Sequence, residues 1–461
     1  MQDTMLQQSL KNLDVIVIGA GFGGLAASIE LAQRGAKVIV FESYPDMKKQ
    51  GDVIQVPANG TRLIKRWGNV LEKIVSISAS PEIMSIMDKK GKVLLDQQLH
   101  TDFDGFPIIY GHRGRIQHFF YDFAVSLGVE VKWGASVGEI FENDVSAGVL
   151  TDDGKKYEAD LVIAADGVHS RSRSFVVETA DRPRKSGFAV YRSWFPLPLL
   201  QNDPVTRDIA NSEKPLFKIW IAEDTHGILT TNPALQSATC FVTHKDLSDV
   251  TEDWNLRGDV GDMLACVKDW DPELRHIIEK IPSECLIDYK LLWRDPVSKW
   301  VSRKGRVCLI GDAAHPHLAT SGTGAAQAIE DAATIGALLE QTGKAKIQLA
   351  LKSYEKLRYG RTSLTQRMGW ETRHVWHQTN WDAVAANPDM LKFPQPAWLL
   401  GSDAKDYAEE NFEAVKASIE NGTPFVSTNV PLGHVHEDWT IETMLAHEGK
   451  LADKNFYKTR D

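Results

Sequence analysis

Short apolar runs bounded by glycine alternate with a helical pattern near the start of the chain. The segment DVIVIG, Asp14–Gly19, has the composition of a buried parallel strand. Residues Gly24–Gln33 are rich in Ala, Leu and Ile and predict a helix, which Gly35 ends. The segment AKVIVFE, Ala36–Glu42, repeats the strand pattern, so the three segments together predict a βαβ unit.

Two further apolar runs, Ala159–Gly167 and Gly305–Ala313, predict strands of the same kind, and the second leads into a small-residue helix at Gly324–Leu339. Between them the pattern changes to a period of two, in Ser186–Phe195, Leu216–Ala222 and Ala238–His244. Such alternation is typical of a mostly antiparallel sheet. The chain therefore predicts an α/β fold, in which a discontinuous Rossmann-like nucleotide-binding domain is interrupted by a β-sheet domain.

We place the domain boundaries where these patterns change. The expected units are a nucleotide-binding domain with its first part at residues 1–182, an inserted substrate domain at 183–300, the second part of the nucleotide-binding domain at 301–345, and a helical C-terminal region at 346–461.

Composition narrows the functional classes. The 461 residues are 43% hydrophobic and 25% charged, which is ordinary for a globular protein, and the formal net charge of −10 gives no support to a nucleic-acid partner. Four scattered cysteines without a CxxC pair suit a reducing compartment. We see no targeting signal, no transmembrane run and no protein partner in the sequence, and we expect a cytoplasmic protein without a membrane partner.

The string GAGFGG fits the pattern G-x-G-x-x-G at Gly19, Gly21 and Gly24, between a strand and a helix as that motif requires. Gly19 permits the tight turn, Gly21 lets a pyrophosphate approach the backbone, and Gly24 lets helix and strand pack closely. The helix N-terminus then offers N–H groups and a positive dipole to the phosphates. Glu42 ends the second strand, where a carboxylate can accept hydrogen bonds from ribose hydroxyls.

Two distant motifs predict a second nucleotide-binding turn. One is Asp166–Gly167 after a buried strand, and the other is GDAAHP, which contains Asp312 and His315 and is followed by the glycine-rich segment Thr320–Ala332. One chain thus carries two turns for a long nucleotide, and FAD is long enough to need both.

This set of motifs resembles the class A flavin-dependent aromatic monooxygenases, the group of salicylate and para-hydroxybenzoate hydroxylases, over about residues 14–370. Among them the chain looks most similar to fungal indole-alkaloid flavin monooxygenases of the paraherquamide and notoamide type. The resemblance implies bound FAD, reduction by NAD(P)H without a second Rossmann domain, and O2 as co-substrate. It also implies contacts to FAD: Glu42 at the adenosine ribose, Gln55 along the flavin, Arg113 at the ribityl–phosphate region, Asp312 at the ribityl chain, and the backbone near Ala325 at the flavin ring or a phosphate.

Arg192 is the candidate catalytic residue of the substrate domain. Alternation places it on one strand face with Phe188, Val190 and Trp194, where a guanidinium is costly to bury without a counterion. One interpretation is an edge strand with Arg192 in solvent. The other, favoured by the resemblance, is a pocket arginine beside the flavin, with Asp46 as its candidate counterion and second catalytic residue. For Asp46 a solvated turn is an equally good interpretation.

The resemblance implies an FAD-dependent monooxygenase that oxidises a small electron-rich aromatic substrate. Our hypothesis is epoxidation of an indole 2,3 double bond in fungal alkaloid biosynthesis, followed by a semipinacol-type shift to a spiro-oxindole, with Arg192 as acid or electrostatic stabiliser. A phenol or salicylate hydroxylase is the alternative, although HGILTTNP (His226–Pro233) lacks the tyrosine that phenol hydroxylases often carry there. An alternative of another class is a non-enzymatic binding protein on a flavoprotein fold. We expect no metal site.

Overall fold

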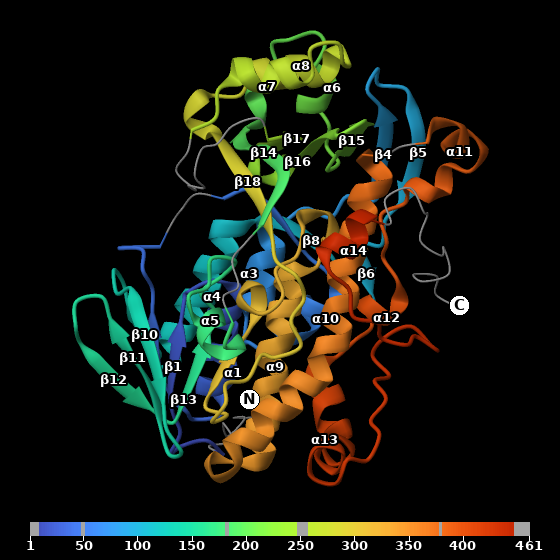
Figure 1. Ribbon diagram of the computed structural model, residues 1–461. Coiled ribbons are helices and arrows are strands. Elements are labelled where there is room, and N and C mark those ends of the chain that lie inside the picture. Colours follow the sequence, from blue (N-terminus) through green and yellow to red (C-terminus); the bar gives the residue numbers. More distant parts are fainter. Residues whose placement is uncertain (1–8, 48–50, 180–183, 247–256, 378–379, 447–461) are drawn as a thin grey trace.

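The computed structural model describes residues 9–47, 51–179, 184–246, 257–377 and 380–446. The predicted boundary between residues 182 and 183 lies outside these ranges, as do the two ends of the chain. Figure 1 shows a parallel sheet in the lower part of the molecule and a larger sheet above it. The long helix α10 (Ile347–His377) extends from the lower part up to the larger sheet.

The parallel sheet is the core of the nucleotide-binding domain. Its strands, in spatial order, are β19 (Val307–Leu309), β13 (Leu161–Ala164), β1 (Asp14–Ile18), β2 (Lys37–Phe41) and β9 (Glu130–Lys132). Val17 of β1 lies between Ile163 and Val40, and all three are fully buried. Sequentially distant runs thus meet in one sheet, which confirms the predicted discontinuous α/β fold.

Three helices are packed at this sheet, the first directly on β1, β2 and β13 and the other two on that first helix. They are α1 (Phe22–Gln33), α4 (Arg113–Ser126) and α9 (Gly324–Thr342). Helix α1 packs against both α9 and α4, so nearly its whole circumference is buried and it shows little amphipathic pattern.

The upper sheet has seven strands. In spatial order they are β18 (Leu286–Trp293), β14 (Arg184–Pro196), β17 (Ser237–Lys245), β16 (Thr225–Asn232), β15 (Phe217–Ala222), β4 (Ile83–Asp88) and β5 (Val93–Gln98). Every pair is antiparallel except β15 with β4. Two strands therefore come from residues 83–98, outside the range expected for the substrate domain; the boundaries themselves stay a prediction.

The two faces of β14 have different neighbours, as the alternation predicts. Tyr191 and Phe195 belong to a core cluster that includes residues of α7 (Val260–Cys266) and α8 (Pro272–Glu279). On the opposite face Trp194 contacts His112 of the nucleotide-binding domain, with ring centroids 4.5 Å apart. This second face of the sheet covers the nucleotide-binding domain.

Smaller elements complete the fold. The remaining strands form small sheets: β3 (Val53–Val56) with β8 (Ile109–His112), β6 (Asp102–Phe103) with β7 (Phe106–Pro107), and β10 (Val137–Glu142), β11 (Ala147–Thr151) and β12 (Lys156–Ala159). The remaining α-helices are α2 (Ala58–Ile64), α3 (Val70–Ser76), α5 (Ser172–Val177), α6 (Arg207–Ala210), α11 (Trp381–Ala386), α12 (Ala397–Leu400), α13 (Ala404–Asn421) and α14 (Ile441–Ala446). The last four, with α10, confirm the predicted helical C-terminal region. Within the described ranges, no helix has both the length and the apolar character needed to cross a bilayer.

Candidate active site

The glycine-rich loop between β1 and α1 has the geometry that its motif predicts. Gly19 has φ +97°, and a Cβ there would lie 2.5 Å from the carbonyl oxygen of Ala165. A Cβ on Gly24 would lie 1.9 Å from the carbonyl oxygen of Gly19. At Gly21 a Cβ would meet no atom within 4 Å, so this residue leaves open space on the ligand side. Gly19 and Gly24 are therefore required by close packing, and Gly21 leaves room for a pyrophosphate.

Glu42 is anchored to the same loop. Its Oε2 accepts a hydrogen bond from the Ala20 N–H at 2.8 Å, and its Oε1 accepts one from the Tyr44 N–H at 2.9 Å. On the other side of the loop, Gln117 Nε2 donates to the Ala20 carbonyl at 2.7 Å. The carboxylate is thus held, half-buried, beside the glycine loop where the ribose contact is predicted.

Arg113 and Asp312 come together although 199 positions (312 − 113) separate them. Arg113 is the first residue of α4, and Asp312 follows β19. The Asp312 side chain is accessible to solvent, yet dense protein surrounds it, and this desolvation raises the pKa of its carboxyl. The charges of Arg113 and His315 act in the opposite direction, which shows that both lie within electrostatic range.

Gln55 lies against the loop that leads into α9, the helix that carries Ala325. Gly322 in that loop has φ +62°, and a Cβ on it would lie 2.4 Å from Gln55 Oε1. Ala325 is the second residue of α9, whose N-terminus offers N–H groups and a positive dipole. The predicted contacts to FAD therefore surround one region, from the glycine loop to the start of α9. The donor set and the open side of Gly21 fit FAD, while the role of each residue stays a prediction.

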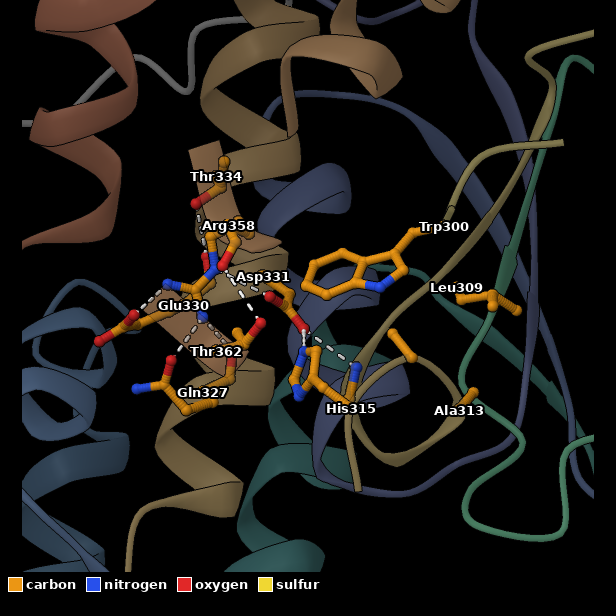
Figure 2. Close-up of polar contacts among 12 residues, drawn as sticks. Trp300, Leu309, Ala313, His315, Gln327, Glu330, Asp331, Thr334, Arg358 and Thr362 are labelled. Carbon is orange, nitrogen blue, oxygen red and sulfur yellow. Dashed lines mark hydrogen bonds and ion pairs between the residues drawn. The ribbon is translucent and has the colours of Figure 1, made fainter. Parts of the chain in front are cut away.

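A buried charge cluster beneath this region holds the Gly311 loop. Figure 2 shows Asp331 of α9 between His315 and Arg358: its Oδ2 lies 2.6 Å from His315 Nε2, and its Oδ1 accepts from Arg358 Nε at 2.9 Å. The Gly311 N–H also donates to Asp331 Oδ2 at 3.0 Å. Burial opposes ionisation of Asp331, but the charges of His315 and Arg358 outweigh it and lower its pKa.

Glu330, next along α9, extends this cluster. It pairs with Arg358, accepts from Arg361 Nε at 2.8 Å, and accepts from Asn59 Nδ2 at 2.6 Å. Desolvation again opposes ionisation, yet the charges of Arg361 and Arg358 lower the Glu330 pKa to about 2. Sequence reasoning missed this cluster. The signal for it is the charged pair Glu330–Asp331 inside an otherwise small and apolar helix.

Arg173 also holds the Gly311 loop in place. Its guanidinium donates to the carbonyl oxygens of Ala313 at 3.2 Å, Ala314 at 2.7 Å and Asp295 at 2.7 Å. Arg173 belongs to the segment that follows Asp166–Gly167, and Asp166 caps that segment by accepting from the Ser172 N–H at 3.1 Å. The two distant motifs predicted from sequence are therefore one connected structure.

Arg192 forms an ion pair with Asp52, and not with Asp46 as the sequence analysis expected. The side chains of Arg192 and Asp52 are 16% and 8% exposed. Asp46 lies exposed in the loop after β2, so its assignment as the counterion is wrong. Strand β14 lies between β18 and β17, which also removes the interpretation of Arg192 as a solvated edge-strand residue.

Close packing of the chain brings Asp52 to this position. A Cβ on the preceding residue, Gly51, would lie 2.8 Å from the Gly114 nitrogen, so only glycine lets the segment pass the start of α4. The Asp52 carbonyl accepts from the Arg113 N–H at 2.9 Å, and Asp52 is 6% exposed. The ion pair thus connects the substrate sheet to the backbone of a predicted FAD contact.

A small cavity lies beside this ion pair and is partly open to solvent; its volume is about 10 Å³, which is room for about one water molecule. Its walls come from β3, β8, β14, β16 and β17, and they include Trp194, Tyr110 and Thr230. A tyrosine therefore does line the candidate substrate site, but it comes from the YGHR segment before α4 and not from the HGILTTNP segment in which it was sought.

Comparisons with known proteins concern the fold and its cofactor. A family model described as FAD binding domain matches residues 12–366. Asperlicin C monooxygenase of Petromyces alliaceus is 34% identical over 445 residues, which cover 94% of this chain and 95% of that protein. The crystal structure of FqzB has a TM-score of 0.84 at 32% identity and covers 92% of this chain and 97% of its own. The crystal structure of CtdE in complex with FAD and substrate 4 has a TM-score of 0.83 at 30% identity and covers 89% and 100%.

Proposed function

The chain belongs to the FAD-binding-domain family and is an FAD-dependent monooxygenase, and we propose that it epoxidises the indole 2,3 double bond of a small alkaloid in fungal secondary metabolism. The relatives named as monooxygenases remove the alternative of a non-enzymatic binding protein. The observation that carries the proposal is the Arg192–Asp52 pair on the sheet face that covers the predicted flavin contacts. The similarity to asperlicin C monooxygenase and to CtdE with its FAD and substrate supports a small-molecule substrate.

FAD is the cofactor, and we propose that Gly19, Gly21 and Glu42 hold its adenosine diphosphate part. Its ribityl and flavin parts would lie along Gln55, Arg113, Asp312 and the backbone near Ala325. When bound and reduced by NAD(P)H, FAD would supply the oxygen chemistry, in which one atom of O2 goes to the substrate and the other leaves as water. The chain's own contribution is to exclude water, orient the double bond and stabilise developing charge.

Arg192 acts on the epoxide. When the C3–O bond of the epoxide breaks, its electron pair remains on the oxygen atom, which stays bonded to C2. The guanidinium donates hydrogen bonds to this alkoxide. A C2 substituent then migrates with its electron pair to C3 while the C2 oxygen becomes the carbonyl of a spiro-oxindole, an isomerisation that needs no further oxidant. Because its guanidinium presents several N–H donors in a fixed plane, Arg192 serves as an electrostatic stabiliser.

Asp52 positions Arg192. A buried guanidinium needs a counterion, and an ion pair also limits the orientations of its N–H donors. A catalytic role for Asp46 stays a prediction, and comparison of Asp46→Asn with Asp52→Asn distinguishes the two carboxylates.

The first experiment follows anaerobic bleaching of FAD by NADPH without ligand, with a prenylated indole and with salicylate, and then admits O2 and weighs the products. The expected result is bleaching accelerated by the indole and a product heavier by one oxygen atom. Arg192→Ala should keep FAD and its bleaching but lose spiro-oxindole, and Arg207→Ala on the exposed helix α6 is the matched control. Unchanged product formation in Arg192→Ala contradicts the mechanism. If only salicylate accelerates the bleaching of FAD, the chain belongs with the phenol hydroxylases.

A further inference from the structure

The last described segment, residues 438–446, is fastened to α10. Asp438 Oδ1 accepts a hydrogen bond from the Tyr359 hydroxyl at 2.6 Å, and Trp439 Nε1 donates to Ser363 Oγ at 3.0 Å. Both partners belong to α10, and helix α14 of this segment lies beside the upper part of α10 (Figure 1). The segment therefore runs along α10.

Ile441, the first residue of α14, covers a pair of stacked tryptophans. It is 3% exposed and packs with Trp293 and Trp370, whose ring centroids are 4.1 Å apart. The Ile441 N–H donates to Asp295 Oδ1 at 2.7 Å, which holds the start of α14 in place. Trp293 ends β18 and Trp370 belongs to α10, so α14 covers a junction between the substrate sheet and α10.

The tryptophan pair adjoins the sheet face that carries Arg192. The Arg373 guanidinium lies 4.3 and 5.0 Å from the centroids of the two tryptophan rings, and 5.1 Å from the centroid of the Phe188 ring. Phe188 and Arg192 are four residues apart on β14 and share one face. The aromatic layer is thus continuous with the sheet face at the candidate substrate site.

The same layer adjoins the loop before α9, around which the predicted flavin contacts lie. Leu318 of this loop packs on the tryptophan pair. One residue before Trp370, a Cβ on Gly369 would lie 2.8 Å from Ser321 Cβ, and the Gly369 carbonyl accepts from the Thr320 hydroxyl at 2.6 Å. Helix α14 therefore covers a layer that borders both the flavin loop and the substrate sheet.

This cover is attached by few contacts. Helix α14 has six residues, which is too short for a helix that is stable by itself. Ile441 is buried and Met444 half-buried, whereas Glu442, Thr443 and Ala446 are exposed. Segments with so little buried apolar surface open locally at a low cost in free energy, and the lids of enzymes are of this kind.

We propose that residues 438–446 form a strap that closes the reaction site on the side of α10 and keeps water out during oxygen transfer. With the strap closed, one atom of O2 reaches the substrate and the other leaves as water. With the strap released, two electrons from NAD(P)H and two protons convert O2 to H2O2, and the substrate is not oxidised. The inference rests on the monooxygenase activity and does not depend on which substrate is oxidised.

The first test measures how far iodide quenches the fluorescence of bound FAD in the oxidised, FAD-loaded enzyme without substrate. Ile441→Asp places a charge against the tryptophan pair, so it should release the strap and raise the quenching constant at least threefold. Val435→Asp is the matched control, because it makes the same kind of change just before the strap, at a residue that is 78% exposed. It should leave the constant unchanged.

Ile441→Ala removes part of the same contact without adding a charge. It should change the quenching constant in the same direction by a smaller factor, and it decides the test where Ile441→Asp does not fold. A folded Ile441 variant with the quenching constant of the wild type overturns the strap.

The second test measures H2O2 formed per NADPH consumed, with cyclo(L-Trp-L-Pro) as the substrate probe. Ile441→Asp should raise this ratio at least threefold, and Val435→Asp should not. An unchanged ratio in an enzyme that oxidises the probe overturns the strap. A wild type that does not oxidise the probe contradicts the proposed function, and the quenching of FAD, which needs no substrate, then decides the strap alone.

Discussion

Two of the groups of buried arginine and carboxylate side chains in the described residues have different surroundings. Within the cluster on α9 and α10, the side chains of Glu330, Asp331, Arg358 and Arg361 are at most 1% exposed. The Arg192–Asp52 pair connects strand β14 to the segment before β3 and retains contact with solvent. The first group joins helices within one core, and the second joins two sheets at the candidate substrate site.

The difference shows how one chemical pairing serves two purposes. In the cluster, each carboxylate is matched by guanidinium groups and further donors, so charge is neutralised inside the protein. At the sheet face, in the described part of the chain, Asp52 is paired with Arg192 beside a cavity. We therefore expect changes in the cluster to alter stability and changes in the pair to alter the reaction.

Glu330→Gln is the most severe way to test this comparison. The variant leaves Arg358 and Arg361 buried with one carboxylate fewer, and breaking a buried ion pair costs about 3–5 kcal/mol. The expected result is a large loss in the free energy of unfolding, or no folded protein, measured by chemical denaturation of the purified chain. A variant as stable as the wild type would contradict a structural role for the cluster.

Acidification should weaken the same cluster without mutation. The folded-state pKa of Glu330 is lowered to about 2 from an ordinary 4.5, so its contribution to stability is complete above pH 4.5 and is lost as the pH falls towards 2. The difference corresponds to about 3 kcal/mol. Denaturation curves between pH 6 and 3 should show a decline below pH 4.5 that is smaller in Glu330→Gln, and equal slopes in the two proteins would contradict the assignment.

Asp52→Asn should affect the reaction more than the fold. The amide keeps the shape but removes the charge that orients Arg192, and we expect product formation to fall about 10–100-fold, which corresponds to about 1.4–2.7 kcal/mol. Turnover and Tm are measured on the same FAD-loaded preparation. Asp269→Asn, at an exposed position, is the control. A lowered Tm with unchanged turnover would make this pair resemble the cluster and remove the contrast.

Arg66→Ala should give the smallest effect. Arg66 pairs with Asp403 at 2.8 Å and with Asp406 at 3.2 Å, but its side chain is 35% exposed, and water screens such pairs. We expect a loss below about 1 kcal/mol in the free energy of unfolding, measured as a small change in Tm. A loss as large as that of Glu330→Gln would show that burial does not distinguish the ion pairs.

The glycine loop could be predicted from sequence because its chemistry is local. Gly19 and Gly24 are adjacent to the strand and helix that need them, so spacing alone gives their roles. The counterion of Arg192 could not be found in this way. Asp46 and Asp52 both follow β2, and only the passage of Gly51 against the start of α4 determines which carboxylate reaches β14.

Contacts between elements that are distant in the sequence could not be predicted either. Nothing in the alternation of β4 and β5 shows that they join a sheet whose other strands begin a hundred residues later, and in parallel with β15. Arg358 and Arg361 likewise look like ordinary helical surface residues until α10 packs on α9. Tertiary context decides both cases.

The parallel pairing of β4 with β15 also has a consequence for the order in which the chain is made. A ribosome releases β4 long before β15 exists, and it releases β1 and β13 before β19. The upper sheet is incomplete until β15 has been made, and the parallel sheet is incomplete until β19 has been made. Until then the early strands have unpaired edges. Cutting the gene between residues 182 and 183 would therefore yield two fragments that each lack strands of both sheets, and only their joint expression would restore the fold.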